Sequence, residues 1–412
     1  MPQLSPIDRL QNHVARAYYH LFPPCSICYD SHMQTKLDMT KPQDIFRKIT
    51  AMLVVTSDQA PSRAAAERRR DELESLCTTL GIKCACWDFF NIRSFNSATY
   101  IGTGQVQRLA WYAQENQCNL VVFNNSVSPR IQRNLEQILG IAVVDRQEII
   151  LQIFANRATT REARLQVELA QLQYSLPRLK RKWGELSQQR GGVKGAKGSG
   201  EKQLELDRRQ AQARIVRLKR EIDEIGKSRD VQRRNRRQGN VPNVAIVGYT
   251  NSGKSTLLNR ISDANVLSED KLFATLDPTT RRVHLPGGGT SLFTDTVGFV
   301  SDLPHELVDS FKSTLEEAVL ADVLLIVLDA SRDDFLMCWE TTRSVLEDLK
   351  AFDKPRLVLL NKMDLVTEET LFAINSFCLS GERCLKVSVK DDPNLEEVLS
   401  TIENMISSKE NP

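Results

Sequence analysis

Short apolar runs alternate with amphipathic stretches in the first part of the chain. Helical spacing of the apolar residues predicts helices over Pro61–Leu80, Gln105–Asn116 and Pro129–Leu139. The runs around them are typical of buried parallel strands and cover Ala51–Thr56, Ile82–Trp87, Asn119–Phe123 and Ile141–Asp145. Strands that alternate with helices imply right-handed crossovers, so we expect a small parallel α/β domain over residues 48–155.

A long helical pattern follows, beginning near Glu148. Ile149, Leu151, Ile153 and Phe154 open it, and Leu165, Val167, Leu169, Leu172 and Leu176 continue it at spacings that favour a helix. A second stretch, Leu204–Ile225, repeats apolar residues at sevens and fours. Two such helices joined by a loop predict an antiparallel hairpin over residues 156–240. Residues 1–47 show no sustained period, and we expect an irregular arm there.

Strands and helices alternate again in residues 241–412. The apolar runs are Val244–Val247, Ser291–Asp295, Val323–Asp329, Arg356–Leu360 and Cys384–Val387, and Leu395–Ile406 predicts a last helix. This pattern favours a doubly wound, mainly parallel sheet. In such folds ligands bind beyond the carboxyl ends of the strands.

A glycine-rich loop joins the first of these strands to a helix. It reads Gly248-Tyr-Thr-Asn-Ser-Gly253-Lys254-Ser255, the GxxxxGK[ST] pattern of a phosphate-binding loop. The glycines permit backbone torsions that turn N–H groups inward around phosphates, and the following helix adds its positive dipole end. We expect Lys254 to bridge the outer phosphates and the Ser255 hydroxyl to bind Mg²⁺. A turn without a ligand is the weaker interpretation, because both flanking elements are present.

Three later strand ends carry motifs of a guanine-nucleotide site. Asp295-Thr-Val-Gly298 is a DxxG, which places a carboxylate near the metal and a glycine N–H near the γ-phosphate. Asn361-Lys-Met-Asp364 is an NKxD, whose Asp364 carboxylate accepts from the N1–H and N2–H groups that guanine has and adenine lacks. Ser388-Val-Lys390 follows the last strand and offers a backbone N–H to guanine O6. Four motifs in this order predict guanine-nucleotide binding.

The basic charge of the chain is concentrated on the predicted hairpin. Residues 176–240 hold 20 Lys and Arg against 8 Asp and Glu, a local charge of +12. Because the whole chain has a net charge of +3, the remaining residues carry −9. The connecting loop between residues 190 and 202 combines five glycines with four cations, Arg190, Lys194, Lys197 and Lys202. Lys and Arg neutralise phosphates without reading sequence. Our hypothesis is that this tip contacts folded RNA; a solvated coiled-coil surface with a bland loop is the alternative.

Composition limits the cellular context. The chain has 412 residues, of which 41% are hydrophobic, and no apolar run approaches the ~20 residues of a membrane span. The N-terminus carries no export signal, so we expect a cytoplasmic protein with no stable membrane anchor. The nine cysteines are typical of reduced thiols. Cys25 and Cys28 form a CxxC with no second pair at zinc spacing, and we interpret it as coincidence or as part of the arm.

The motifs resemble those of the HflX family of ribosome-associated translation GTPases. The likeness rests on the phosphate loop, on Phe273-Ala-Thr275-Leu-Asp277-Pro-Thr-Thr-Arg281, on DTVGF and NKMD, and on the hairpin sequences LQVELAQLQYSLPRL and GSGEKQLELDRR. It implies that Thr275 is the second hydroxyl on Mg²⁺ and senses the γ-phosphate; spacing alone does not separate it from Thr279 or Thr280. It also implies binding to the large ribosomal subunit, with the hairpin loop directed at ribosomal RNA, and splitting or rescue of stalled ribosomes.

The predicted site therefore draws on five stretches of sequence. We expect Mg²⁺ to be held by Ser255 and Thr275 and the protein to be a monomer. The hairpin tip departs from the family pattern by Lys197 for Arg and Ser199 for Pro, which predicts weaker RNA contacts. The expected nucleotide-binding residues are Gly248, Tyr249, Thr250, Asn251, Ser252, Gly253, Lys254, Ser255, Phe273, Ala274, Thr275, Leu276, Asp277, Asp295, Thr296, Val297, Gly298, Asn361, Lys362, Met363, Asp364, Ser388, Val389 and Lys390.

No catalytic side chain is assigned by the motifs. Phe299 follows the DxxG, where many GTPases carry a glutamine that orients water, and Arg281 and Arg282 have no motif that places them at the site. We expect slow hydrolysis of GTP alone and stimulation by ribosomes. One alternative is a GTPase that remodels RNA or assembles pre-ribosomal particles. Another is a regulatory GTPase that docks on a protein or on lipid, and use of ATP by the N-terminal domain stays open.

Overall fold

The computed structural model describes residues 46, 48–57, 63–92, 94–189, 197–237, 241–262, 272–273, 276–300, 312–379, 381–391 and 395–410. Within these ranges, the side chains of residues 179–189, 197–204, 207, 228–237, 312–315, 369 and 409–410 lie outside the description. The chain divides into two compact units, Met1–Asn156 with Val167–Lys219, and Arg157–Gln166 with Arg220–Pro412. The two long hairpin helices are thus shared between the units. The predicted domain boundaries at residues 155 and 240 stay predictions.

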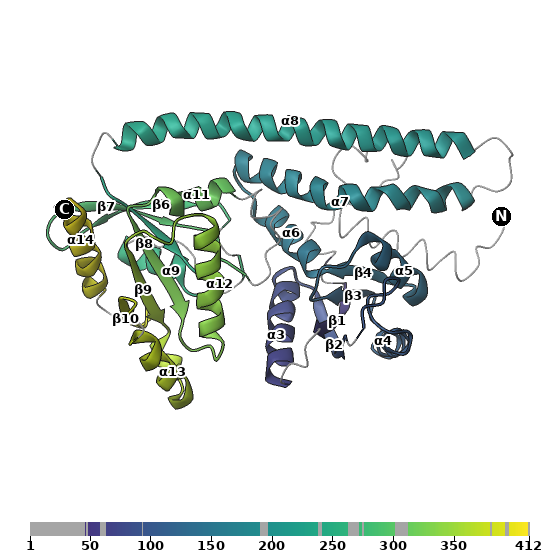
Figure 1. Ribbon diagram of the computed structural model, residues 1–412, viewed down its shortest axis with the longest axis horizontal. Helices are drawn as coiled ribbons and strands as arrows, with labels where there is room; N and C mark the ends of the chain where they lie inside the picture. Colours follow the sequence, from purple (N-terminus) through teal and green to yellow (C-terminus); the bar gives the residue numbers. More distant parts are fainter. Residues whose placement is uncertain are drawn as a thin grey trace. The chain divides into compact units, whose positions relative to one another are not determined.

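The first unit is built on a parallel four-stranded sheet (Figure 1). Its strand order is β2-β1-β3-β4, and all neighbouring strands are parallel. All four predicted strands and all three predicted helices are present, with ends shifted by a few residues. The elements are β1 (Thr50–Ser57), α3 (Arg63–Thr79), β2 (Lys83–Asn91), α4 (Thr103–Glu115), β3 (Leu120–Phe123), α5 (Pro129–Leu139) and β4 (Ala142–Asp145).

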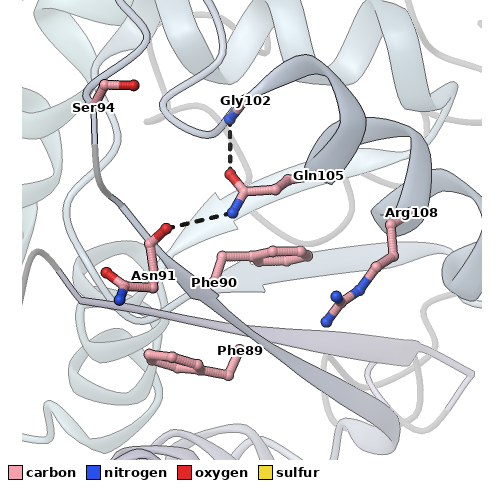
Figure 2. A pocket seen from close by; sticks show the side chains of 7 residues that line it. All are labelled: Phe89, Phe90, Asn91, Ser94, Gly102, Gln105 and Arg108. Atoms are coloured by element: carbon pink, nitrogen blue, oxygen red, sulfur yellow. Dashed lines mark hydrogen bonds between the residues drawn. The ribbon is translucent and has the colours of Figure 1, made fainter. Parts of the chain in front are cut away.

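Helix α4 begins at a glycine whose N–H group is satisfied by a side chain. The Gln105 side-chain oxygen accepts from Gly102 N–H at 2.8 Å, and the Gln105 amide donates to Asn91 O at 3.4 Å (Figure 2). Gly102 has extended torsions and is the N-cap of the helix. The sequence Gly102-Thr-Gly104 is therefore a turn that starts a helix.

The predicted helix after Glu148 is in fact two helices, α6 (Arg146–Arg157) and α7 (Arg161–Gln189). The break falls on Ala158-Thr-Thr160, where Thr160 caps α7 by accepting from Ala163 N–H at 3.1 Å. Threonine is a good N-cap because its hydroxyl satisfies an otherwise unpaired N–H. Apolar periodicity alone does not place this break, because helical spacing of the apolar residues stops at Phe154 and resumes at Leu165.

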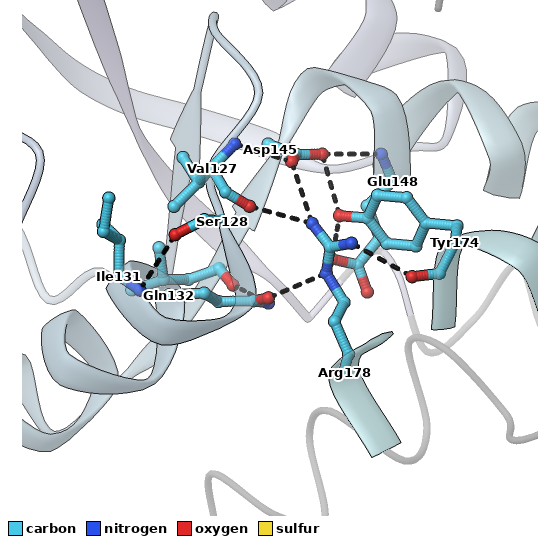
Figure 3. Close-up of polar contacts among 9 residues, drawn as sticks. Val127, Ser128, Ile131, Gln132, Asp145, Glu148, Tyr174 and Arg178 are labelled. Carbon is cyan, nitrogen blue, oxygen red and sulfur yellow. Dashed lines mark hydrogen bonds and ion pairs between the residues drawn. The ribbon is translucent and has the colours of Figure 1, made fainter. Parts of the chain in front are cut away.

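A buried polar cluster joins α7 to the end of β4 (Figure 3). The Arg178 guanidinium donates to Val127 O at 2.9 Å, to Gln132 Oε1 at 3.1 Å and to Asp145 Oδ2 at 3.3 Å. The Tyr174 hydroxyl donates to the other Asp145 oxygen at 2.9 Å. Burial raises the pKa of Asp145, and Arg178 opposes that rise. A carboxylate that is 1% exposed is stable here because its charge and lone pairs are matched.

Helix α8 (Lys197–Arg237) returns alongside α7 and completes the predicted hairpin (Figure 1). Two nitrogens of the Arg214 guanidinium, Nε and Nη2, donate to the two carboxylate oxygens of Glu168, each at 2.8 Å. The predicted seam is buried at Leu165, Val167, Leu169 and Leu172 on α7 and at Ala211 and Leu218 on α8. The predicted loop is shorter than expected, because α8 already begins at Lys197.

The second unit contains a six-stranded sheet of order β10-β9-β8-β5-β7-β6. Every pairing is parallel except that of β6 with β7, and β6 is an edge strand that the apolar pattern did not predict. The strands are β5 (Asn243–Val247), β6 (Thr279–His284), β7 (Thr290–Asp295), β8 (Val323–Asp329), β9 (Arg356–Asn361) and β10 (Cys384–Lys386).

Helices cover both faces of this sheet, as the doubly wound prediction requires. Residues of α11, α12 and α13 share one apolar cluster with alternate strand positions, and residues of α9 and α14 share the other. The helices are α9 (Lys254–Ile261), α11 (Lys312–Leu320), α12 (Phe335–Asp348), α13 (Glu368–Cys378) and α14 (Glu396–Glu410), with a short turn η2 (Met363–Leu365). Strand β5 lies between β7 and β8, so the loop after it opens at the switch point of the sheet.

Candidate functional site

The loop after β5 has the backbone geometry of a phosphate cradle. Gly248 and Gly253 have φ of 143° and 102°, and a Cβ on Gly248 would lie 2.2 Å from Val327 O. Asn251 also has a positive φ, 60°, which the sequence did not indicate. Gly253 is the N-cap of α9, so the free N–H groups of that helix face the loop. The glycines thus stand where the sequence predicted that only glycine fits.

Lys254 is buried at the centre of the loop, with 6% of its surface exposed. Its ammonium donates to Tyr249 O at 2.7 Å. Burial lowers the pKa of Lys254 to about 8, and the nearby Asp295 carboxylate opposes this shift. A buried cation beside a backbone carbonyl is poised to exchange that partner for an anion.

Two buried hydroxyls of the loop have no hydrogen-bond partner among the described residues. They are Thr250 Oγ1 and Ser252 Oγ. Gly298 approaches the same place, since a Cβ there would lie 2.8 Å from Thr250 Cα and 2.9 Å from Lys254 Nζ. Buried polar atoms without partners are costly in a folded protein. The oxygen atoms of a bound phosphate, or water molecules around it, would provide hydrogen-bond partners for both hydroxyls.

The Ser255 hydroxyl and the Asp295 carboxylate form an oxygen-rich pair at the end of β7. Ser255 Oγ donates to Asp295 Oδ2 at 2.7 Å, and Asp295 is 1% exposed. Hydroxyl and carboxylate oxygens are the donors that Mg²⁺ prefers, usually with several waters and phosphate oxygens completing its shell. In the described part of the chain no three His, Cys, Asp or Glu side chains gather at a metal site. The pair fits Mg²⁺, which needs few protein ligands.

The DxxG segment is bound to the phosphate loop by backbone pairing. Phe299 N–H donates to Gly248 O at 3.0 Å, and Thr250 N–H donates to Phe299 O at 2.7 Å. The Phe299 side chain is 1% exposed and packs in the apolar cluster that includes residues of α12 and α13. It therefore offers no polar group to a water molecule. Thr296 is also tied to the loop strand, through its hydroxyl to Ile246 O at 2.8 Å.

Asn361 joins three of the predicted motifs. Its side-chain amide donates to Ser252 O in the phosphate loop at 2.8 Å, and its side-chain oxygen accepts from Val389 N–H at 2.9 Å. Asp364 N–H donates to the Ser388 hydroxyl at 3.0 Å, and the Asp364 carboxylate is exposed. The NKxD and Ser-Val-Lys motifs, separated in sequence, thus lie together with Asp364 open to a ligand.

Lys362 has a structural role that its motif did not reveal. It takes a left-handed φ of 62°, and its ammonium pairs with Asp329 at the end of β8 at 2.7 Å. Arg332, also unpredicted, lies with its guanidinium carbon 5.6 Å from the Tyr249 ring centre and binds both oxygens of Asp334. Both side chains stiffen the loops around the site.

The stretch before β6 is described only in part. Phe273 and Leu276 are buried, and Asp277 is hydrogen-bonded to Thr159 and Thr160 ahead of α7. Ala274 and Thr275 lie outside the described residues, so the predicted Mg²⁺ role of Thr275 stays a prediction. Sequence reasoning named Asp277 as a nucleotide-site residue but found no partner for it, because Thr159 and Thr160 carry no motif.

The predicted RNA-contacting residues lie at the edge of the described structure. Arg190 and Lys194 are outside it, as are Cys25 and Cys28. Lys197 and Lys202 belong to the first turns of α8, and their side chains are not described. The tip hypothesis therefore stays untested. Of the helices that are described, none has both the length and the apolar character of a bilayer-crossing segment.

A separate cavity of about 430 Å³ opens on the first unit. Figure 2 shows its lining, which includes Phe89, Phe90 and Arg108. The Arg108 guanidinium is already bonded to Asp88. None of the predicted nucleotide-site residues lines this cavity, so it is separate from the site described above.

Three known families match consecutive parts of the chain between residues 67 and 362. Residues 67–155 match the family described as GTP-binding GTPase N-terminal, residues 157–236 the GTP-binding GTPase Middle Region, and residues 243–362 the 50S ribosome-binding GTPase family. The first match covers β2 to β4, the second covers the hairpin helices, and the third covers the strands from β5 to β9.

Curated relatives are similar over most of their length. The chain is 45% identical to GTPase HflX of Akkermansia muciniphila over 379 residues, 90% of this chain and 86% of that protein. It is 50% identical to GTPase HflX of Treponema denticola over 321 residues, 76% of this chain and 82% of that protein. The solved SsGBP–GDP complex is 24% identical, with a TM-score of 0.50 over 88% of this chain and 99% of that one, which shows a shared fold.

Proposed function

The chain belongs to the HflX family of GTPases, and from this premise we propose that it acts on ribosomes, coupling GTP binding and hydrolysis to the splitting or rescue of stalled particles. The observation that carries the proposal is the joining of two features in one chain. One is a set of phosphate and guanine motifs that meet at one edge of a sheet, and the other is a hairpin whose residues 176–240 carry a local charge of +12. A cation-rich arm neutralises RNA phosphates.

The nucleotide would occupy the edge of the second sheet where the motifs meet. Its phosphates would lie in the cradle of Gly248 to Ser255, replacing Tyr249 O as the partner of the Lys254 ammonium. The guanine base would pair with Asp364, which has an exposed carboxylate next to Ser388. Ser255 and Thr275 would hold Mg²⁺, with Asp295 behind Ser255; when bound, the ion neutralises charge on the phosphate oxygens.

Hydrolysis by this site alone should be slow. The side chain of Phe299 is buried in the apolar core, so the usual position for a water-orienting group is filled by a ring that faces away. A ribosomal partner would have to order the site or supply the missing group, as partner-supplied groups do in other GTPases. We therefore propose stimulation by ribosomes in the cytoplasm.

The test is the rate of GTP hydrolysis with and without purified large subunits, at fixed protein concentration. The proposal predicts a rise of at least about tenfold, which is well below the 10³–10⁵-fold that a partner-supplied group can give. An isolated protein that already hydrolyses GTP at its full rate, with no gain from subunits, would refute it. Stimulation by immature particles in preference to mature subunits would instead favour a role in ribosome assembly.

A further inference from the structure

The turn ahead of α7 is fastened to the stretch ahead of β6 by one carboxylate. Asp277 accepts hydrogen bonds from the N–H groups of Thr159 and Thr160, each at 3.2 Å, and from both threonine hydroxyls. These partners lie more than a hundred positions from Asp277 in the sequence. Four donors converge on one side chain, which is a full set of partners for a carboxylate.

The chemistry of this contact favours a charged Asp277. Hydrogen bonds donated to a carboxylate favour its charged form, and Asp277 accepts four of them. Thr160 is also the N-cap of α7, a helix of 29 residues. A negative charge at the N-terminus of a helix is stabilised by the helix dipole. The contact thus links the start of α7 to the stretch before β6, within the second unit.

Asp277 lies between the predicted γ-phosphate sensor and a fixed strand. Thr279, the first residue of β6, pairs with Asp295 at the end of β7, and Thr280 and Thr294 share a hydroxyl contact at 2.9 Å. Thr275 precedes Asp277 by two positions, a chain span of at most ~7 Å. Through β6, Asp277 is therefore joined to Asp295, which accepts from the Ser255 hydroxyl of the phosphate loop.

We propose that Asp277 is a positioning residue of the GTPase site, through which the bound nucleotide controls the first turn of α7. The inference rests on the proposed function, because it assumes that Thr275 engages Mg²⁺ when GTP is bound. Exchange of GTP for GDP alters the hydrogen bonds that Asp277 accepts from Thr159 and Thr160. The stability of the first turn of α7 changes as a result. Coupling between two sites is reciprocal, so a partner that strains α7 changes the preference for GTP over GDP.

The experiment is amide hydrogen exchange of the full-length protein, followed in the segment from residue 158 to 170. Samples hold saturating GDP or a non-hydrolysable GTP analogue, without ribosomes. In the natural protein we expect the exchange rates of this segment to differ about tenfold between the two nucleotides, a usual size for allosteric coupling. Asp277→Asn keeps the size of the side chain but loses its charge. It should remove the difference in exchange rate between the two nucleotides.

Matched variants separate coupling from simple destabilisation. Thr159→Val removes one hydroxyl donor and leaves the Thr160 cap intact, so it should reduce the difference even if Asp277→Asn folds poorly. Thr159→Ser keeps the hydroxyl and should behave as the natural protein. Asp353→Asn changes an exposed carboxylate in the same unit and should have no effect.

Two results would overturn the inference. One is an unchanged nucleotide-dependent difference in Asp277→Asn or Thr159→Val. The other is equal exchange with GDP and with the GTP analogue in the natural protein. Since ribosomes are absent, failure to bind ribosomes would refute the proposed function and leave this measurement to decide the inference alone.

Discussion

Lys254 shows how one side chain can report on the nucleotide. Burial lowers its pKa to about 8 in the chain without ligand, and bound phosphates should return it toward the usual ~10.4. Binding must then take up a proton at any pH where the free protein has lost it. The sign follows directly: affinity for GDP should fall as the pH rises above about 8.

Calorimetry in buffers of different ionisation enthalpy tests this expectation. At pH 8.5 the heat of GDP binding should depend on the buffer in the direction of proton uptake by the complex. At pH 6.5 Lys254 is already protonated and contributes no uptake. Absence of uptake at pH 8.5 would mean that Lys254 does not meet the phosphates.

At Gly298 the neighbouring atoms leave no room for a side chain. A Cβ at this position would meet Thr250 Cα at 2.8 Å and Lys254 Nζ at 2.9 Å, where the outer phosphate is expected. Gly298→Ala should slow GTP hydrolysis by about 10²-fold, the usual effect of losing one preorganised donor. GDP binding should change far less. Single-turnover hydrolysis and fluorescent GDP titration measure the two effects.

The control for that variant is Gly289→Ala, in the turn between β6 and β7. Its Cβ would meet only side-chain atoms at 3.6 Å and 3.7 Å, which are ordinary contacts. Its hydrolysis rate should match that of the natural protein. Equal loss in both variants would show that the assay reports general destabilisation.

At the scale of elements, α7 depends on the polar cluster at Asp145. Arg178→Ala would leave a carboxylate that is 1% exposed without its cation, and breaking a buried pair in this way costs about 3–5 kcal/mol. Arg209→Ala removes an exposed pair with Glu205 on α8 and should cost less than about 1 kcal/mol. Urea unfolding monitored by circular dichroism compares the two.

The pH dependence of Arg178→Ala gives an internal check. Burial already raises the pKa of Asp145, and loss of Arg178 raises it further. The folded variant then binds a proton at a pH where the unfolded chain does not, so its stability should recover as the pH falls from 7 to 5. A deficit that is the same at both pH values would show that Asp145 is not the source of the cost.

The elements also show what sequence periodicity can and cannot predict. The buried strands and their helices were predicted because apolar runs and helical spacing are local properties. The break between α6 and α7 was missed, because Thr159 and Thr160 are followed by the same apolar spacing. Strand β6 was missed because it is an edge strand with exposed side chains at five of six positions. Its stability comes from pairing with β7, which no local pattern records.

In the site, the motifs predicted which residues carry the chemistry, but they did not predict all of the contacts that hold those residues in place. The torsions of Gly248 and Gly253 follow from the phosphate-loop pattern, and the meeting of Asn361 with Val389 follows from strand order in a doubly wound sheet. The hold of Asp277 on Thr159 and the pairing of Lys362 with Asp329 depend on tertiary contacts between distant stretches. Those contacts have no signature in a single sequence.

At the scale of the whole molecule, the hairpin tip is the expected point of contact with RNA. Replacing Lys194 and Lys197 by Glu should weaken binding to ribosomal RNA and reduce its salt dependence, since each lost phosphate contact lowers the salt slope by about 0.9. Arg343→Glu, in an exposed pair on α12, is the matched control. Filter binding at several salt concentrations measures both. Unchanged binding at every concentration would reject the tip as a contact.

We propose that the bound guanine nucleotide governs how the basic hairpin engages ribosomes. Co-sedimentation of the protein with ribosomes and with isolated subunits, in the presence of GDP or of a non-hydrolysable GTP analogue, tests this proposal. We expect the protein to pellet with large subunits when the analogue is bound and to stay largely in the supernatant with GDP. Equal pelleting with both nucleotides, or none with either, would contradict it.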